Sequence, residues 1–366
     1  MPFVRFGFVP AFATGLLLVS STLRAAEPYI LDLAEHPTAK LEAACPKAIA
    51  APVVTVVEKT RPSPTGDPHD YVSYGRYWWP DPTKVDGLPF IRRDGHHNRE
   101  QLKFSDTERF NRMVNSVETL ALGWAELHRA DCATRAGDWL RAWFVTPATR
   151  MNPNFSYAQI RLGRDGNRGS SFGLIDGRAF IRVVDALRLL EGSPALSASD
   201  DRAVHQWFAD YLQWFVTSAQ GKAEAKAPNN HGSWYLQQRL VFNRYLGRDT
   251  EARKLAETDR ARIAKQIKPD GRQPLELARA DSLGYSAFNL EAQLGVALLA
   301  AQVGVDLWHY EAPNGGSLKK ALDYLRPYNA DPKTWTGEQL KQLEPGFLDP
   351  HLALVARIES TLAQRQ

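Results

Sequence analysis

Residues 105–127 read SDTERFNRMVNSVETLALGWAEL, and this stretch carries the clearest structural signal in the chain. Apolar side chains recur along it at three- and four-residue spacing, from Phe110 to Trp124. That period is typical of an amphipathic helix with one buried face. Ser105 followed by Glu108 also matches the capping-box pattern of a helix start. The stretch therefore predicts a long helix that begins near Ser105.

The helical period continues through most of the chain. It predicts further helices at 132–144, 177–190, 200–218, 233–246, 250–267, 285–303, 316–326 and 349–364. Strand-like alternation is scarce, and Thr55-Val56-Val57 is the best short candidate. Short connections favour antiparallel packing of consecutive helices. Because no fixed-period repeat is present, we expect an all-α fold, an α/α toroid or incomplete α/α barrel of helical hairpins, rather than a repeat solenoid.

Residues 61–100, here called the arm, differ from this pattern. Prolines are too dense for a helix to run through the arm, which predicts a long ordered loop. Its aromatic side chains can either pack the arm onto the toroid or hold a polymer in a cleft. The candidate substrate contacts in the arm are Tyr71, Tyr74, Arg76, Trp78, Arg92 and Asn98.

The composition is that of an ordinary globular protein, with 366 residues, 44% hydrophobic and 23% charged. Residues 1–25 resemble a secretory signal, with Arg5 before an apolar stretch and small residues at its end. We therefore expect a periplasmic or secreted protein with one domain over 26–366 and no membrane insertion. The formal net charge of +4 does not indicate a nucleic-acid partner.

Cys45 and Cys132 are the two cysteines of the chain. An oxidising compartment favours a disulfide between them, and two buried free thiols are the alternative. Two cysteines without suitably spaced histidines do not make a zinc site.

Residues 229–235 read NNHGSWY and bring together two amides, an imidazole, a hydroxyl and two aromatic rings. Amide and imidazole groups can donate hydrogen bonds to a carboxylate, and aromatic rings can stack on a sugar. This combination suggests a site for an acidic carbohydrate. Asn229 can instead cap a helix, and Trp234 with Tyr235 can instead pack the helix that follows.

A second notable segment reads PLELAR at 274–279 and DSLGYSAFNL at 281–290. Arg279 and Tyr285 lie six residues apart across a predicted loop-to-helix start. Taken alone, these residues are also explained without a functional site, by an ion pair between Glu276 and Arg279 and a Tyr285 ring that packs in the core.

Together the two segments resemble the alginate lyase superfamily of polysaccharide lyases. HDY at 69–71, YWWPDP at 77–82 and GLPFIR at 87–92 also resemble its N-terminal region, so the similarity spans roughly 45–300. The resemblance implies an enzyme that cleaves the 1,4-glycosidic bond of a polyuronate, such as alginate, polymannuronate or glucuronan. It implies β-elimination with no cofactor and no metal.

The resemblance also implies roles for individual residues. Asn230 and His231, with Arg279, would neutralise the uronate carboxylate, which is required before the weakly acidic C5 proton can leave. Tyr285 would carry out proton transfer, and the nearby Arg279 would favour its phenolate form. Further substrate contacts would come from Asn229, Trp234 and Glu276.

Two alternatives remain open from the residues themselves. A glycoside hydrolase on the same toroid would need a pair of carboxylates, for which Asp176, Glu276 and Asp281 are the candidates. A non-catalytic polysaccharide-binding protein would use the same cleft without reaction.

Overall fold

The computed structural model describes residues 26–365, so the predicted signal sequence lies outside the described residues. Helices dominate the described chain, and the helices are α1 (Thr38–Ala50), α2 (Arg99–Leu102), α3 (Thr107–Leu127), α4 (Ala130–Leu140), α5 (Phe180–Leu189), α6 (Ala198–Thr217), α7 (Ala219–Glu224), α8 (Asn230–Tyr245), α9 (Asp249–Glu257), α10 (Asp259–Gln266), α11 (Pro274–Leu277), α12 (Ser282–Gln302), α13 (Leu318–Leu325) and α14 (Asp349–Ala363). The strands are β1 (Val72–Tyr74), β2 (Trp78–Trp79), β3 (Ile91–Arg92) and β4 (Tyr157–Ile160).

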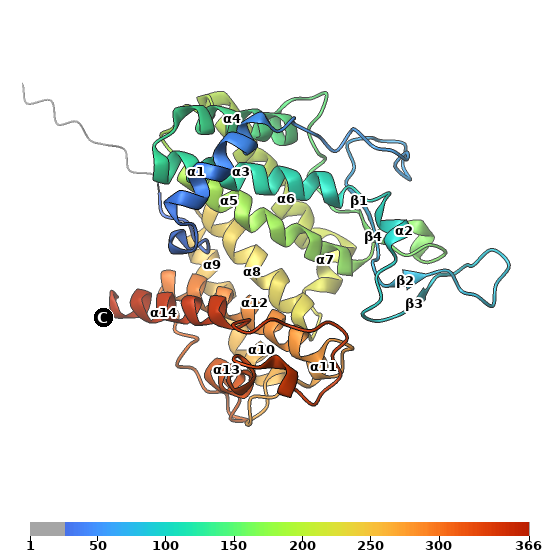
Figure 1. Ribbon diagram of the computed structural model, residues 1–366, viewed down its shortest axis with the longest axis vertical. Helices are drawn as coiled ribbons and strands as arrows, with labels where there is room; N and C mark the ends of the chain where they lie inside the picture. Colours follow the sequence, from blue (N-terminus) through green and yellow to red (C-terminus); the bar gives the residue numbers. More distant parts are fainter. Residues whose placement is uncertain (1–25, 366) are drawn as a thin grey trace, which may run out of the picture.

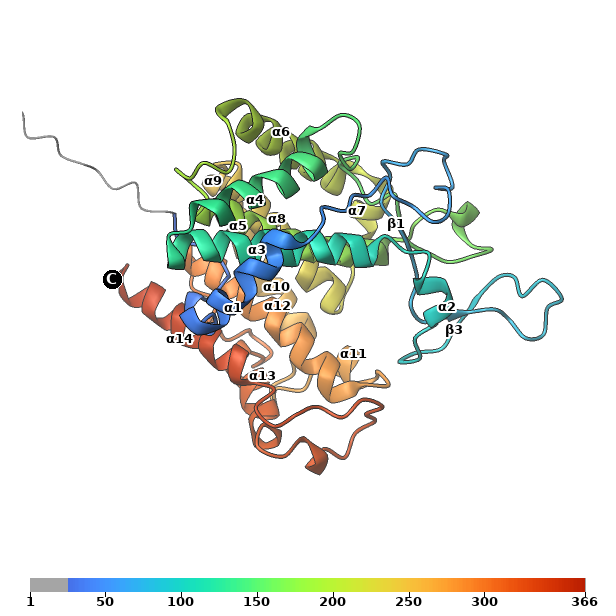
Figure 2. The ribbon, with the colours of Figure 1, turned by 45° about the horizontal axis from the view of Figure 1, so that its top comes forward.

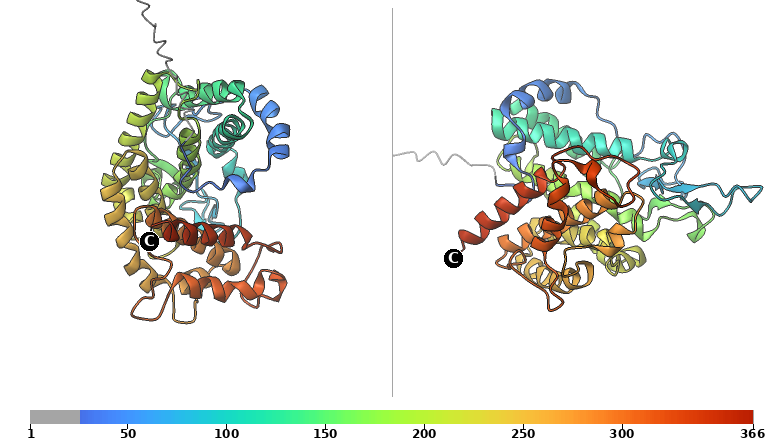
Figure 3. Two further views of the ribbon diagram at one scale, coloured as in Figure 1. Left: turned by 90° about the vertical axis from the view of Figure 1, so that its left-hand side faces the viewer. Right: turned by 60° about the horizontal axis from the view of Figure 1, so that its bottom comes forward.

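The helices follow one another around an open ring (Figure 3). Helix α3 packs on α4 and α5, α5 on α8, α8 on α12, and α12 on α14. Helix α12 is buried almost all round because it lies between several neighbours. This arrangement of antiparallel hairpins confirms the predicted incomplete α/α toroid.

Many aromatic residues fill the toroid core rather than a ligand site. Phe110, Phe155 and Phe180 contact one another edge to face, with ring centroids 4.9–5.9 Å apart. Trp139 and Trp143 are fully buried beside them. Such rings contribute large buried areas to the hydrophobic stabilisation of the fold.

The arm projects from one end of the helices (Figure 1) and stands clear of them in a second view (Figure 2). Strands β2 and β3 pair antiparallel within the arm, and β1 pairs in parallel with β4. The predicted arm is thus ordered, and short strands hold its base.

Several local predictions differ from the structure. Thr55-Val56-Val57 contains no strand and ends in a turn. The expected helix at 250–267 is interrupted at Thr258 and forms α9 and α10. The expected helix at 177–190 begins as a 3₁₀ segment, η4 (Ser171–Ala179), before α5. Within residues 26–365, no helix combines the length and the apolarity needed to cross a membrane.

The predicted cysteine disulfide is absent from the structure, in which Cys45 and Cys132 are buried free thiols. Both sulfur atoms nevertheless pack against Gly123, because a Cβ placed on this glycine would lie 2.4 Å from one and 2.8 Å from the other.

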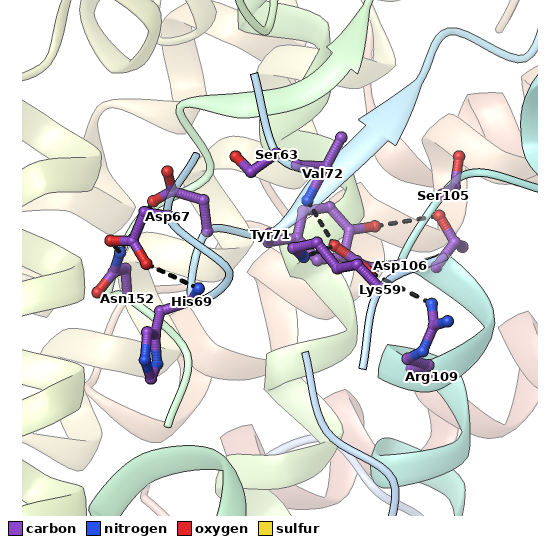
Figure 4. A network of polar contacts seen from close by, with 12 residues as sticks. Lys59, Ser63, Asp67, His69, Tyr71, Val72, Ser105, Asp106, Arg109 and Asn152 are labelled. Carbon is purple, nitrogen blue, oxygen red and sulfur yellow. Dashed lines mark hydrogen bonds and ion pairs between the residues drawn. The ribbon is translucent and has the colours of Figure 1, made fainter. Parts of the chain in front are cut away.

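The start of α3 is held by a buried ion pair instead of the predicted capping box (Figure 4). Ser105 accepts the Tyr74 N–H, and Asp106 is the N-cap residue of α3. The Asp106 carboxylate pairs with Lys59 and accepts the Val72 N–H. This network fastens the base of the arm to the toroid.

Replacing Asp106 should therefore destabilise the fold strongly. In Asp106→Ala, the Lys59 ammonium, only 7% exposed, is left buried without its partner. We expect a loss of about 3–5 kcal/mol in the free energy of unfolding, measured by denaturant titration. Glu100→Ala removes the exposed pair to Lys103 and should cost less than about 1 kcal/mol. Equal effects of the two substitutions would contradict this account.

Candidate active site

A cleft of about 580 Å³ lies where the arm meets the toroid. Four segments of the chain contribute most of its lining. The arm contributes Arg76, Tyr77, Trp78 and Arg92, and the start of α8 contributes Asn229, Asn230 and His231. The region around the start of α12 contributes Arg279, Asp281, Gly284, Tyr285 and Phe288, and the loop before α14 contributes Gln339, Lys341 and Leu343. Residues from distant parts of the sequence therefore share one cavity. All four predicted catalytic residues are among them.

Asn230 is held in place by a buried carboxylate. Its backbone N–H donates to Glu276 Oε1 and its side-chain Nδ2 to Glu276 Oε2, both at 2.7 Å. Burial raises the pKa of Glu276, although the bonds from Asn230 oppose that rise. Asn229 is the N-cap residue of α8, but its side chain makes no capping hydrogen bond and lines the cleft instead.

His231 has a second buried carboxylate as its partner. Its Nδ1 lies 2.6 Å from Oε1 of Glu224, which is at the end of α7 and only 1% exposed. This contact leaves Nε2 as the ring nitrogen available to the cleft. Phe172 packs edge-on against the imidazole at 5.3 Å. Sequence reasoning missed Glu224, whose spacing of seven residues before His231 was the one available signal.

Arg279 does not present a free charge. It donates to both oxygens of Asp94 in the arm, at 2.7 and 2.8 Å, and its guanidinium lies 3.6 Å from the centre of the Tyr285 ring. Burial alone would raise the pKa of Asp94, but the bonds and charge of Arg279 hold it well below its usual range. The ion pair therefore joins the arm to the catalytic side of the toroid.

Tyr285 is a protonated phenol at neutral pH, although the charge of Arg279 favours its phenolate as expected. Burial and the hydrogen bond that Tyr285 shares with Tyr77 raise the pKa of Tyr285, and the charge of Arg279 offsets only part of that rise. The two phenol oxygens lie 2.8 Å apart. The arm thus reaches the hydroxyl of the predicted proton-transfer residue.

The predicted substrate contacts divide into two groups. Arg76, Trp78, Arg92 and Asn229 line the cleft. Tyr71, Tyr74, Asn98, Trp234 and Glu276 are buried and lie outside the cleft lining. Asn98 and Glu276 serve the fold, since Asn98 Nδ2 donates to the Trp78 carbonyl and Glu276 accepts from Asn230.

The cleft rim carries further cations. Arg161 and Arg164 each lie 5.1 Å from the centre of the Trp78 ring, which places the loop that follows β4 beside the arm. Lys341 adds a cation from the opposite wall. Across residues 26–365, no group of three or more His, Cys, Asp or Glu side chains is arranged to hold a metal ion. Cationic side chains therefore gather around the cleft.

Breaking the arm's ion pair should loosen the arm. In Asp94→Asn, Arg279 loses its charged partner, and the exposed basic sites of the arm, such as Lys84 and Arg93, should be cut by trypsin about tenfold faster. Asp86→Asn is the matched control, because Asp86 lies in the same arm and accepts only a local N–H from Leu88. Equal cleavage rates in the two variants would show that the pair does not fasten the arm.

Comparison with known proteins agrees with this geometry. The family model described as alginate lyase matches residues 55–335. An alginate lyase from Bacteroides ovatus has 34% sequence identity and a TM-score of 0.85, over 93% of this chain and 95% of that one. No match was found among curated proteins.

More distant solved structures share the fold. Alginate lyase A1-III from a Sphingomonas species has 13% identity and a TM-score of 0.52, over 90% of this chain and 88% of that one. A tetrasaccharide complex of alginate lyase A1-III has 13% identity and a TM-score of 0.55, with the same coverage.

Proposed function

The chain belongs to the alginate lyase family and is a polysaccharide lyase, and from this premise we propose that it cleaves the 1,4-glycosidic bond of a polyuronate by β-elimination. The products would carry 4,5-unsaturated uronate ends. The observation that carries the proposal is the convergence of Asn230, His231, Arg279 and Tyr285 on one cationic cleft. Alginate, polymannuronate and glucuronan are the candidate polymers.

Neutralisation of the uronate carboxylate is the first requirement of the reaction. Loss of the C5 proton places further negative charge beside a group that is already an anion, so donors aimed at the carboxylate stabilise the transition state. Asn230 keeps one Nδ2 hydrogen for the substrate after donating the other to Glu276. His231 offers Nε2, and Glu224 fixes the orientation of its ring.

Tyr285 is the proposed proton-transfer group. In β-D-mannuronate and β-D-glucuronate, H5 and O4 lie on the same side of the sugar. Tyr285 in its phenolate form can therefore remove the C5 proton, and the phenol so formed can then protonate the leaving oxygen. Arg279, against the ring, stabilises the phenolate while it exists. In α-L-guluronate the two groups lie on opposite faces, and His231 would supply the second proton transfer.

The three candidate carboxylates for a hydrolase all make hydrogen bonds within the protein. Asp176 accepts hydrogen bonds from Tyr71, Ser73 and Gln159. Glu276 holds Asn230, and Asp281 accepts the Lys341 N–H. These contacts favour elimination over hydrolysis, because none leaves a carboxylate pair free to flank a glycosidic bond.

Export to the periplasm or beyond is part of the proposal and rests on the signal-like residues 1–25. Polymeric substrates are met outside the cytoplasm.

Tyr285→Phe tests the chemistry directly. The wild-type protein should convert a polyuronate into products whose conjugated double bond absorbs ultraviolet light. The variant should lose turnover by about 10²- to 10⁴-fold, because the group that moves the protons is gone, while binding of oligouronates is kept. Unimpaired turnover in the variant would remove Tyr285 from the mechanism. New reducing ends without ultraviolet absorbance in the wild type would indicate a hydrolase.

Glu224→Gln tests the orientation of His231. The amide keeps the shape but not the charge, so the imidazole loses its charge-assisted partner, and kcat/KM should fall by about 10- to 100-fold. His231→Ala should lower kcat/KM further, by about 10²- to 10³-fold, because a hydrogen-bond donor to the substrate carboxylate is lost. If Glu224→Gln retained wild-type kcat/KM, the buried carboxylate would have only a structural role.

The pH dependence of activity should follow the ionisation of the Tyr285 phenol. Because the pKa of Tyr285 is raised, the phenolate fraction and kcat/KM should increase from neutral to alkaline pH. Tyr77→Phe removes a hydrogen bond that contributes to that raised pKa, so the increase should move to lower pH. Tyr324→Phe, on α13 away from the cleft, should leave the profile in place. A Tyr77→Phe profile that moves to higher pH would contradict the assignment.

A further inference from the structure

Helix α10 holds the turn that leads into α8 by the carbonyl oxygens of that turn. Residues 227–229 connect α7 to α8 and stand directly before Asn230. Arg262 Nη1 donates to the Ala227 carbonyl at 2.9 Å. Gln266 Nε2 donates to the two carbonyls that follow, at 3.0 and 3.1 Å. Two side chains of one helix therefore bond three consecutive carbonyl groups of the turn.

Gly232, in the first turn of α8, makes room for one of these contacts. A Cβ on this glycine would lie 2.2 Å from both the Ala227 carbonyl oxygen and Arg262 Nη1. The missing side chain therefore lets the guanidinium reach the turn. Asp259, one turn earlier on α10, is fully buried 3.6 Å from Arg262 Nε and balances its charge. The glycine of the NNHGSWY block thus serves the contact between α8 and α10.

The side chain of Gln266 is also where α8 and α12 meet. Its Oε1 accepts hydrogen bonds from Ser233 Oγ on α8 at 3.1 Å, and from Asn289 Nδ2 and Gln293 Nε2 on α12 at 3.0 and 2.8 Å. All four residues are buried. The amide nitrogen of Gln266 thus faces two carbonyls and its oxygen faces three donors, which fixes the orientation of the amide.

The same contacts extend to the acid that holds Asn230. Asn289 Nδ2 also donates to Gln273 Oε1 at 2.6 Å, and Gln273 Nε2 donates to a backbone carbonyl of α12 at 3.0 Å. The Gln273 carbonyl accepts the backbone N–H of Glu276 at 3.0 Å, and Glu276 bonds Asn230. Buried amides therefore link α12, which carries Tyr285, to the first turn of α8 by a second route.

This polar cluster consists of Ser233, Gln266, Gln273, Asn289 and Gln293, and none of these side chains lines the cleft. Asn289 Oδ1 and Gln293 Oε1 have no hydrogen-bond partner among residues 26–365. Unpaired buried polar atoms cost stability, and apolar side chains of the same shape would pack the helices at lower cost. What hydrogen bonds add is direction, because each one tolerates a narrow range of distances and angles.

We propose that Gln266, supported by Arg262, is a positioning residue of the proposed reaction. It sets the first turn of α8, and with it Asn230 and His231, relative to Tyr285 on α12. It does so from the core of the toroid, without contact to the substrate. This inference rests on the proposed function and adds α10 to the elements on which that function depends.

Gln266→Met tests the inference, because methionine has a similar length and volume but makes neither donation to the turn. On a polyuronate that the wild-type protein degrades, kcat should fall about 10- to 100-fold, since small displacements of groups that act in the transition state are costly. KM should stay within about threefold of the wild-type value. Unchanged kcat in a folded Gln266→Met protein would overturn the inference.

The matched control is Gln302→Met. Gln302 is the last residue of α12, far along the helix from Tyr285, and its Nε2 also donates to a backbone carbonyl, that of Tyr29, at 2.9 Å. This variant should keep the wild-type kcat. An equal loss of kcat in Gln302→Met and Gln266→Met would show a general effect of losing such a bond, and it would overturn the inference.

A double-mutant cycle separates positioning from a general loss of stability. If Gln266 acts through the start of α8, Gln266→Met should lower kcat/KM by a factor that is about threefold or more smaller in the His231→Ala protein than in the wild type. Equal factors in the two backgrounds would show that Gln266 acts on the fold as a whole, and would overturn the inference.

Amide hydrogen exchange gives a measurement that does not depend on activity. In Gln266→Met, the backbone amides of residues 230–235 should exchange about tenfold faster than in the wild type, while those of α3 keep their rates. Unchanged exchange at 230–235 would contradict the inference. Failure of the proposed function is seen separately, as a wild-type protein that yields no unsaturated product from any polyuronate.

A second variant covers the case in which Gln266→Met does not fold, as judged by circular dichroism. Arg262→Lys keeps a positive charge beside Asp259 but lacks the planar fork that reaches the Ala227 carbonyl. It should lower kcat and speed exchange at 230–235 in the same direction. Wild-type kcat and exchange in a folded Arg262→Lys protein would equally overturn the inference.

Discussion

Two buried carboxylates fix the first turn of α8, and the chemistry of the cleft depends on them. Glu276 accepts both the backbone and the side-chain N–H of Asn230, and Glu224 accepts from His231. Both acids are buried, yet together they orient Asn230 and His231, the two side chains that can donate hydrogen bonds to a carboxylate in the cleft. Hydrogen bonds to buried charged groups are strong and orienting, so the donors are preorganised before any sugar arrives.

The arm supplies contacts to two of the cleft residues that the toroid carries. Asp94 and Tyr77 reach Arg279 and Tyr285 from the arm, and Asp106 with Lys59 fastens the arm's base. Tyr285, the proposed proton-transfer residue, is therefore surrounded by groups from two separate parts of the chain. Burial keeps its phenol protonated at rest, and a neighbouring guanidinium is at hand when the phenolate forms.

The sequence predicted most of the long helices, because the helical period is a local signal. The resemblance to the alginate lyase superfamily singled out the four residues that line the cleft. It did not predict the partners of those residues. Asp94 pairs with Arg279 across 185 positions, and Glu276 with Asn230 across 46; only folding reveals such contacts. For the same reason Glu276, Tyr74 and Asn98 were assigned to substrate, although all three are buried.

Mass spectrometry of the oligosaccharides released from a polyuronate tests the central claim most directly, namely that the cleft neutralises a uronate carboxylate so that its C5 proton can leave. Elimination predicts that every new non-reducing end is lighter by one molecule of water than the corresponding hydrolysis product. Fully hydrated ends throughout the product series would contradict the account.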